Sequence, residues 1–255
     1  MRFACLGSGS RGNAFIVEHG STRLMLDCGF RLEETVRRLE RCGIDAESLS
    51  AIIVTHEHAD HVSGVARFAR TYRVPVYLTY GTLVATGAVL ASAEVRKVMI
   101  DGHSAFAIGD LEVFPLPVPH DAREPVQFVF GDGVHRLGIL TDTGCATAHI
   151  EAMLSGLDAL VLECNHDEEM LRDGSYPPTV KHRISGRLGH LANRAAAELL
   201  ARLDATRLQH VIAAHLSQQN NRASLARTAL ADVLGCNAEW IGVADQEEGL
   251  CWRSL

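Results

Sequence analysis

A stretch of six residues, HEHADH at positions 56–61, carries three histidines and two acidic residues, one residue after the apolar run AIIV. Such a run is typical of a buried strand, so the cluster follows a strand at the edge of a sheet. Imidazole and carboxylate groups at this density suit divalent ions such as zinc or manganese. In an extended or tightly turned segment, His56 and His58 point the same way and can share one ion. Asp60 and His61 lie past the turn and can reach a second ion, so the pattern predicts a binuclear metal enzyme rather than a solvated polar loop.

Three further side chains that could bind metal each follow an apolar run later in the chain. His120 follows LPVP, Asp142 follows LGIL after one threonine, and His215 follows VIAA. We expect His120 to complete the imidazoles of the first ion, and a carboxylate at Asp142 can bridge two ions. Because these groups leave strands at their C-terminal ends, they can meet at one sheet edge. The expected metal ligands are His56, His58, Asp60, His61, His120, Asp142 and His215.

A glycine-rich stretch near the start offers a competing interpretation. Residues 7–12, GSGSRG, fit the GxGxxG pattern of dinucleotide-binding proteins, and Asp27 follows at a suitable distance. That fold requires a helix directly after the third glycine. The next residues, NAFIVE, are instead apolar and β-branched and lead into a glycine turn. We therefore expect a tight loop at the sheet edge, with Asp27 ending the third strand near the metals.

Length and composition limit the class of protein. A chain of 255 residues that is 47% hydrophobic can bury a sizeable core, and no apolar run approaches the length of a membrane span. The N-terminus lacks the hydrophobic region of a signal peptide, and the seven scattered cysteines include no CxxC pair, so we expect a cytoplasmic protein with free thiols. With a net charge of −7, a polyanionic substrate would need the metals and a local basic patch.

The order of strand-like and helical patterns predicts an α/β (α+β) protein with a single domain over residues 1–255. Two halves, each with strands first and helices after, suggest two sheets packed face to face with helices outside, a four-layer αββα sandwich. Strands are expected at 2–6, 14–18, 22–26, 51–54, 76–78, 98–100, 105–108, 111–114, 127–130, 137–140, 159–162 and 210–213. Helices are expected at 33–41, 65–72, 80–91, 148–154, 191–203 and 225–234.

The motifs at 56–61, His120, 141–143 and His215 resemble the metal motifs of the metallo-β-lactamase superfamily. The likeness runs from Leu6 to at least Asn221, and it implies a metallo-β-lactamase sandwich with a dinuclear site. The chain is too short for the additional nucleic-acid clamping domain of the larger nucleases in this superfamily, and it lacks a long flexible arm.

Four segments narrow the resemblance. Residues 7–13, 163–167, 176–193 and 215–221 resemble the YycJ/WalJ branch, whose members are cytoplasmic exonucleases that trim DNA from 5′ ends. The pair of motifs GH, ending at His190, and HLS, starting at His215, is also similar to ribonuclease Z, which processes transfer RNA. This likeness implies that His190 assists catalysis and that His215 holds the second ion.

The segment KHRISGRLGH at 181–190 concentrates cations in an otherwise acidic protein. Arginine offers bidentate donors to phosphate, and the helix expected to follow would present N-terminal amides that favour anions. A solvated basic loop is the alternative interpretation. The residues expected to contact substrate are Lys181, Arg183, Ser185, Arg187 and Asn221.

The mechanism that fits these groups is phosphodiester hydrolysis. Two divalent ions about 3.5–4 Å apart, with zinc expected first and manganese or iron also suitable, would generate a hydroxide between them near neutral pH. Asp60 would orient this hydroxide, and Arg183 or Arg187 would stabilise the added negative charge. His190 would donate a proton to the departing oxygen. Glu163 could orient His190, or it could be only a pocket wall.

Other functions use the same ligands. An RNA-processing nuclease, a hydrolase of small esters, thioesters or lactones, and a metal-binding protein without activity are the alternatives. The expected partner is nucleic acid, with DNA favoured over RNA by resemblance to one branch, and no membrane. Because all seven ligand positions are filled, we favour an enzyme over a protein that only binds metal.

Overall fold

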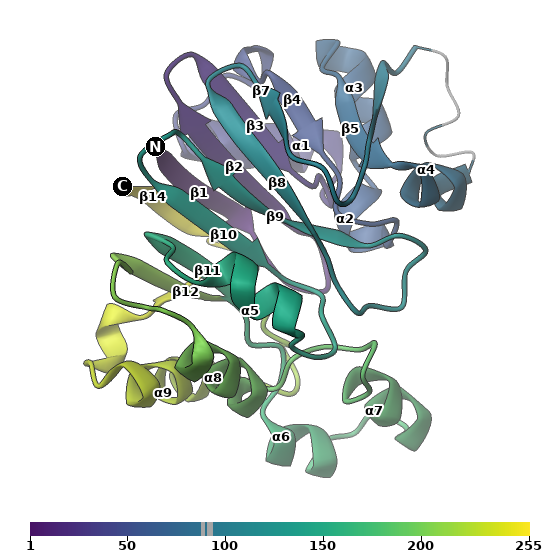
Figure 1. Cartoon of the computed structure of the whole chain (residues 1–255). Helices are drawn as coiled ribbons and strands as arrows, with labels where there is room; N and C mark the ends of the chain where they lie inside the picture. Colours follow the sequence, from purple (N-terminus) through teal and green to yellow (C-terminus); the bar gives the residue numbers. More distant parts are fainter. Residues whose placement is uncertain (88–89, 91–93) are drawn as a thin grey trace.

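Two sheets packed face to face carry the fold (Figure 1). The computed structural model describes residues 1–87, 90 and 94–255. Within these residues the first sheet has the order β14-β1-β2-β3-β4-β5-β6 and the second the order β13-β12-β11-β10-β9-β8-β7. The strands of the first sheet are β1 (Arg2–Gly7), β2 (Ala14–His19), β3 (Thr22–Leu26), β4 (Ala51–Ile53), β5 (Val76–Thr79), β6 (Lys97–Ile100) and β14 (Leu250–Ser254). Those of the second are β7 (Phe106–Ile108), β8 (Leu111–Pro117), β9 (Val126–Gly131), β10 (Arg136–Leu140), β11 (Ala159–Glu163), β12 (His210–Ala214) and β13 (Gly242–Val243).

Helices cover the outer face of each sheet. The first sheet is covered by α1 (Leu32–Arg41), α3 (Val65–Tyr72) and α4 (Tyr80–Thr86), with the short helix α2 (Ala59–Val62) at its edge. The second is covered by α5 (Ala148–Leu154), α8 (Asn193–Arg202) and α9 (Ala223–Leu234). Two short helices, α6 (Glu168–Asp173) and α7 (Pro178–Ile184), project beyond them, and two single turns of 3₁₀ helix span Ala46–Ser48 and Ala238–Trp240.

Three apolar clusters hold these layers together. Between the sheets, Phe3 and Phe15 of the first sheet belong to one buried cluster with Phe128 and Phe130 of the second. Neighbouring positions on the strands point the other way, toward the helices, because side chains alternate along a strand. Ile16, Leu39 and Phe68 lie in the cluster under α1 and α3, and Leu160, Leu199 and Leu230 in the cluster under α8 and α9. This arrangement confirms the predicted four-layer sandwich.

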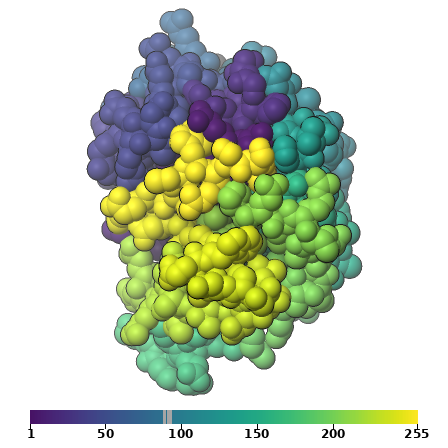
Figure 2. Space-filling view, turned by 90° about the vertical axis from the view of Figure 1, so that its left-hand side faces the viewer, coloured from purple at the N-terminus to yellow at the C-terminus, as the bar shows by residue number. Residues whose placement is uncertain are grey.

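The C-terminal strand completes the first sheet. β14 pairs antiparallel with β1, so that Arg2 lies opposite Ser254 and Phe3 opposite Arg253. Figure 2 shows the C-terminal residues lying against the N-terminal segment. Neither β14 nor β13 was expected from sequence, because β13 has only two residues and the residues of β14, LCWRS, do not alternate between apolar and polar.

Several predicted boundaries are wrong. Helix α7 was missed; it includes the start of the basic segment 181–190 and begins at Pro178, a residue favoured in the first turn of a helix. Helix α6 was also missed; it begins after Asp167, whose side chain accepts hydrogen bonds from two backbone amides of the first turn. The helix predicted at 80–91 ends at Thr86, and residues 88, 89 and 91 of that prediction lie outside the described residues.

The length and composition of the helices bear on whether the chain could cross a membrane. Among the residues that the structure describes, no helix combines the length and the apolar character that crossing a membrane requires.

Candidate metal centre

All seven side chains expected to bind metal lie together at the end of the sandwich where strands of both sheets terminate. The 56–61 segment leaves β4 of the first sheet, whereas His120, Asp142 and His215 follow β8, β10 and β12 of the second. The carboxyl ends of the parallel strands β10, β11 and β12 lie side by side, which brings Asp142, Glu163 and His215 into contact.

Three histidines form the first group of ligand atoms. His56, His58 and His120 each offer a ring nitrogen within 4.8 Å of the others. Nε2 of His120 lies 3.3 Å from Nδ1 of His58, and the ring of His56 is centred 4.6 Å from that of His58 and 4.9 Å from that of His120. Three converging imidazoles are a ligand set typical of zinc enzymes.

The second group consists of Asp60, His61 and His215, and Asp142 lies between the two groups. Oδ2 of Asp60 lies 3.5 Å from Nε2 of His61 and 3.6 Å from Nε2 of His215. Oδ2 of Asp142 lies 3.2 Å from Nε2 of His61, and its other oxygen lies 4.0 Å from Nε2 of His120. The Asp142 carboxylate therefore faces both groups.

Unpaired polar atoms test whether this cluster fits metal. Nε2 of His56, Oδ2 of Asp142 and Nε2 of His215 are buried and have no hydrogen-bond partner among the residues that the structure describes. Leaving one such atom unsatisfied costs about 1–3 kcal/mol. All three atoms belong to the expected ligands and point into the cluster. Divalent metal ions fit this donor set, because each ion would satisfy atoms that the protein leaves unpaired.

Hydrogen bonds behind the ligands fix which ring nitrogen each histidine presents. Nδ1 of His61 lies 2.7 Å from Oδ2 of Asp27, and Thr55 donates to both oxygens of Asp27 from its backbone amide and its hydroxyl. The Thr55 hydroxyl oxygen also lies 2.9 Å from Nδ1 of His56. Such contacts leave Nε2 free for metal. The expected location of Asp27 is confirmed, whereas Thr55 was missed, although it directly precedes the histidine motif.

The glycine-rich loop before β2 positions Asp60 and does not form a nucleotide-binding turn. Asn13 donates through its side-chain amide to the Gly9 carbonyl at 3.0 Å and lies 3.3 Å from Oδ2 of Asp60. Gly12 has φ 150°, and a Cβ there would lie 2.6 Å from the ring of Phe30. No helix follows the loop, since residues 14–19 form β2. The tight loop at the sheet edge is therefore confirmed.

Backbone strain is concentrated at the site. Asp27, Asp142 and His215 have φ of 60°, 50° and 55°, in the left-handed region that non-glycine residues rarely adopt. Such a conformation costs on the order of 1–3 kcal/mol and persists only where the surroundings enforce it. For His215, the Ser8 hydroxyl accepts from the backbone amide and Asn165 donates to the carbonyl, both at 3.0 Å. This backbone conformation directs Asp142 and His215 into the cluster and Asp27 toward His61.

The ligands shift one another's pKa values. Burial favours the neutral form of Asp142, but His215 and His61 outweigh burial and hold the pKa of Asp142 well below its usual value. Burial likewise opposes the charge on His215, yet Asp142, Asp60 and Glu163 raise the pKa of His215 to about 10. Burial and the nearby His61 lower the pKa of His56 well below its usual value. The Asp142 carboxylate and the neutral His56 imidazole are therefore the forms that metal binding requires, whereas His215 would release a proton when metal binds.

His190 lies beside the ligands and is held by Glu163. Its Nδ1 is 2.8 Å from Oε1 of Glu163, which is also 3.2 Å from Nδ1 of His215. Burial raises the pKa of Glu163, but His190 and His215 outweigh it and lower this pKa to about 2. The ionised Glu163, at the end of β11, therefore fixes the ring orientation of His190. This is one of the two roles that the sequence allowed for Glu163.

The five residues expected to contact substrate occupy different places. Arg183 lines a cleft of about 200 Å³ together with His58, Asp60 and His190, and its Nε donates to Oδ2 of Asp121 at 2.6 Å. Asp121 was missed by sequence analysis, although it follows His120 directly. Its carbonyl oxygen lies 3.3 Å from Nε2 of His58, so it connects Arg183 to the ligands.

The other four residues do not line this cleft. Lys181 donates to the Arg172 carbonyl at 2.6 Å and, with Ser185, lines a neighbouring cavity. Arg187 is exposed. Asn221 is buried, and its side chain bonds to the Cys164 carbonyl at 2.7 Å and to the amide of Asn193. The Asn221 side chain therefore stabilises the fold instead of contacting substrate. Its place in a polar segment of the sequence gives no sign of this burial.

Comparison with known proteins gives a consistent result. Residues 22–211 match the β-lactamase superfamily domain. The chain is 35% identical to exodeoxyribonuclease YycJ of Bacillus anthracis over 92% of this chain and 89% of that protein. It is 32% identical to exodeoxyribonuclease WalJ of Streptococcus pneumoniae over 95% of this chain and 91% of that protein. The crystal structure of the metallo-β-lactamase fold protein YhfI from Bacillus subtilis superposes with a TM-score of 0.77 and 15% identity, covering 99% of this chain and 98% of that one.

Proposed function

Since the chain belongs to the β-lactamase superfamily, we propose that it is a metal-dependent exonuclease that hydrolyses phosphodiester bonds of DNA from the 5′ end. One observation carries this proposal. Ligands from both groups line one cleft together with His190 and Arg183, and Glu163 holds His190 from behind. The preference for DNA and for the 5′ end rests on the relatives, which are named exodeoxyribonucleases.

The proposed cofactor is a pair of divalent ions, with zinc preferred and manganese or iron as alternatives. His56, His58 and His120 would hold one ion, Asp60, His61 and His215 would hold the other, and Asp142 would offer an oxygen to each. When bound, such ions polarise a phosphoryl oxygen and lower the pKa of water to about 7.

The side chains around the ligands have separate roles. In hydrolysis the elements of water add across the bond between phosphorus and the departing sugar oxygen, which must receive a proton. His190 is placed to donate it, because Glu163 holds its Nδ1 and leaves Nε2 for proton transfer. Asp60, supported by Asn13, would orient the attacking water.

Arg183 would bind the phosphate of the substrate. Its guanidinium is largely exposed at the rim of the cleft and is paired with Asp121. A phosphate entering the cleft would compete with that carboxylate, and a bidentate arginine–phosphate pair adds geometric specificity to the attraction. Lys181, Ser185 and Arg187, on and after α7, would contact the strand further from the metals.

The test is incubation of the purified protein, loaded with zinc or with manganese, with single- and double-stranded DNA and RNA labelled at the 5′ end. A thioester serves as a parallel substrate. We expect release of the labelled 5′-terminal nucleotide from DNA, and loss of that release in the Asp142→Ala variant. Faster digestion of RNA would make the protein an RNA-processing nuclease. Cleavage of the thioester alone would overturn the nuclease proposal and indicate a small-molecule hydrolase.

A further inference from the structure

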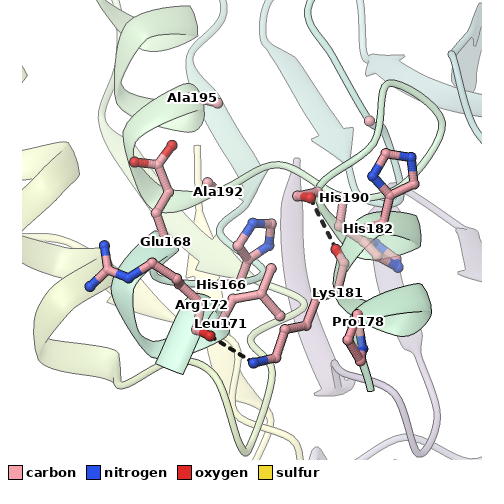
Figure 3. Close-up of a pocket in the computed structure, with 12 residues that line it drawn as sticks. His166, Glu168, Leu171, Arg172, Pro178, Lys181, His182, His190, Ala192 and Ala195 are labelled. Carbon is pink, nitrogen blue, oxygen red and sulfur yellow. Dashed lines mark hydrogen bonds between the residues drawn. The ribbon is translucent and has the colours of Figure 1, made fainter. Parts of the chain in front are cut away.

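A second cavity opens on the far side of His190 from the ligand groups. It has a volume of about 500 Å³ and is bounded by α6, α7 and the start of α8. His190 lines both this cavity and the metal cleft, so the two spaces meet at this residue. Figure 3 shows the residues that line the cavity. The volume lies within the range of about 300–1,000 Å³ that is typical of small-molecule sites. We call this cavity the end pocket.

The lining of the end pocket combines apolar and basic side chains. Leu171, Ala192 and Ala195 supply apolar surface, and the buried ring of His166 lies beside them. The imidazole of His166 is held through Nδ1, which lies 3.3 Å from Oδ1 of Asn165. A flat heteroaromatic ring could pack against this surface, since bases bind proteins chiefly by stacking on rings and apolar side chains.

Basic groups surround the opening of the end pocket. Arg172, Lys181 and His182 line it, and Lys181 reaches across from α7 to the Arg172 carbonyl of α6, as Figure 3 shows. Glu168 also lines the pocket, but its carboxylate is paired with Arg194 at 3.3 Å. Arg172 is likewise paired, with Asp173 at 2.9 Å, so the rim offers the ammonium of Lys181 to a ligand that carries phosphate next to its ring system.

The position of His190 decides which part of a substrate reaches the end pocket, and this step rests on the proposed function. His190 donates its proton to the sugar oxygen that departs, so the nucleotide bearing that oxygen lies on the His190 side of the cleft. The end pocket begins at the same imidazole. In digestion from a 5′ end, the departing nucleotide is the terminal one.

We infer that the end pocket binds the 5′-terminal nucleoside monophosphate of the strand being digested, with the base against His166 and Leu171 and the phosphate toward Lys181. A base that remains paired brings its partner strand with it, and a cavity of about 500 Å³ has the size of a site for a single small ligand. The terminal nucleotide must therefore be unpaired before cleavage. Frayed, mismatched or single-stranded ends are better substrates than stable paired ends, and the base contributes to their binding.

The experiment compares two DNA strands that differ only in the terminal residue, one with an unpaired adenine and the other with an abasic analogue. Stacking of one base corresponds to about a 5- to 150-fold change in binding. We expect the wild-type protein to digest the strand with the base at least about fivefold faster at limiting substrate. Ala195→Leu narrows the pocket and should reduce this preference to less than about twofold. Ala197→Leu, on the same helix but outside the pocket lining, should keep the wild-type preference.

Two further measurements keep the test decisive. Metal content, measured by elemental analysis, reports on the metal centre, and both leucine variants should bind as much metal as the wild type. Should Ala195→Leu fail to fold, inhibition of the wild-type protein by deoxyadenosine monophosphate is compared with inhibition by deoxyribose 5-phosphate, and we expect the nucleotide to inhibit at least about fivefold more strongly.

The outcomes separate the two proposals. Digestion of DNA at equal rates with and without the terminal base, together with equal inhibition by the two phosphates, overturns the end pocket and leaves the nuclease function intact. Failure to digest any nucleic acid overturns the proposed function and the end pocket with it.

Discussion

Oε1 of Glu163 lies 2.8 Å from Nδ1 of His190, and this contact joins the end of β11 to the segment before α8. Because the same oxygen also lies 3.2 Å from Nδ1 of His215, one buried carboxylate positions both a proposed metal ligand and a proposed proton donor. A change at Glu163 therefore affects metal binding and proton transfer together, whereas a change at His190 can separate them.

Replacing His190 with alanine should lower kcat by a factor of about 10²–10⁴, because the departing oxygen loses its proton donor. Metal content, measured by elemental analysis, should remain that of the wild type. His149→Ala is the matched control, since His149 is exposed on α5, away from the cleft. Full turnover in the His190 variant would remove His190 from the mechanism.

Replacing Asp142 with alanine should remove metal and activity together, because its carboxylate is the group that faces both sets of ligands. In the wild-type protein, chelation should lower the thermal midpoint, since a bound ion stabilises only the folded state. In Asp142→Ala, the chelator should change the midpoint far less. An unchanged metal content in this variant would contradict the ligand assignment.

Replacing Asp27 with asparagine should weaken metal binding about 10- to 100-fold, as is typical for a group that orients a ligand from behind. The reason is the contact of 2.7 Å between Asp27 and Nδ1 of His61. The affinity is measured by competition with a chromophoric chelator. Asp101→Asn changes an exposed aspartate on a turn and should leave the affinity unchanged.

Replacing Arg183 with alanine should weaken DNA binding and reduce the slope of log affinity against log salt by about 0.7–0.9, the contribution of one phosphate contact. Arg67→Ala removes an exposed arginine of α3 that pairs with Glu33 and does not line the cleft, and its slope should match the wild type. Binding is measured by fluorescence anisotropy at several salt concentrations. An unaltered slope in Arg183→Ala would show that Arg183 contacts no phosphate.

The sequence by itself determined the layers and the ligand types. Apolar runs that alternate or are continuous identify strands such as β2 and β11 because burial of one or both faces leaves a local pattern. A side chain that follows a strand within two residues, such as Asp142 or His215, lies at the end of that strand and so at the sheet edge. This placement does not depend on the surrounding elements. These inferences need only neighbours in the chain.

Only the tertiary structure decided what surrounds the ligands. The contact of Arg183 with Asp121 joins residues 62 positions apart. The hydrogen bonds from the Asn221 side chain to Cys164 and Asn193 join three distant parts of the chain. Whether a polar side chain in a loop faces a cleft or the interior depends on the conformation of that loop, which distant packing sets. The end pocket exists for the same reason, because two short helices that leave no strong periodic pattern fold over the start of α8.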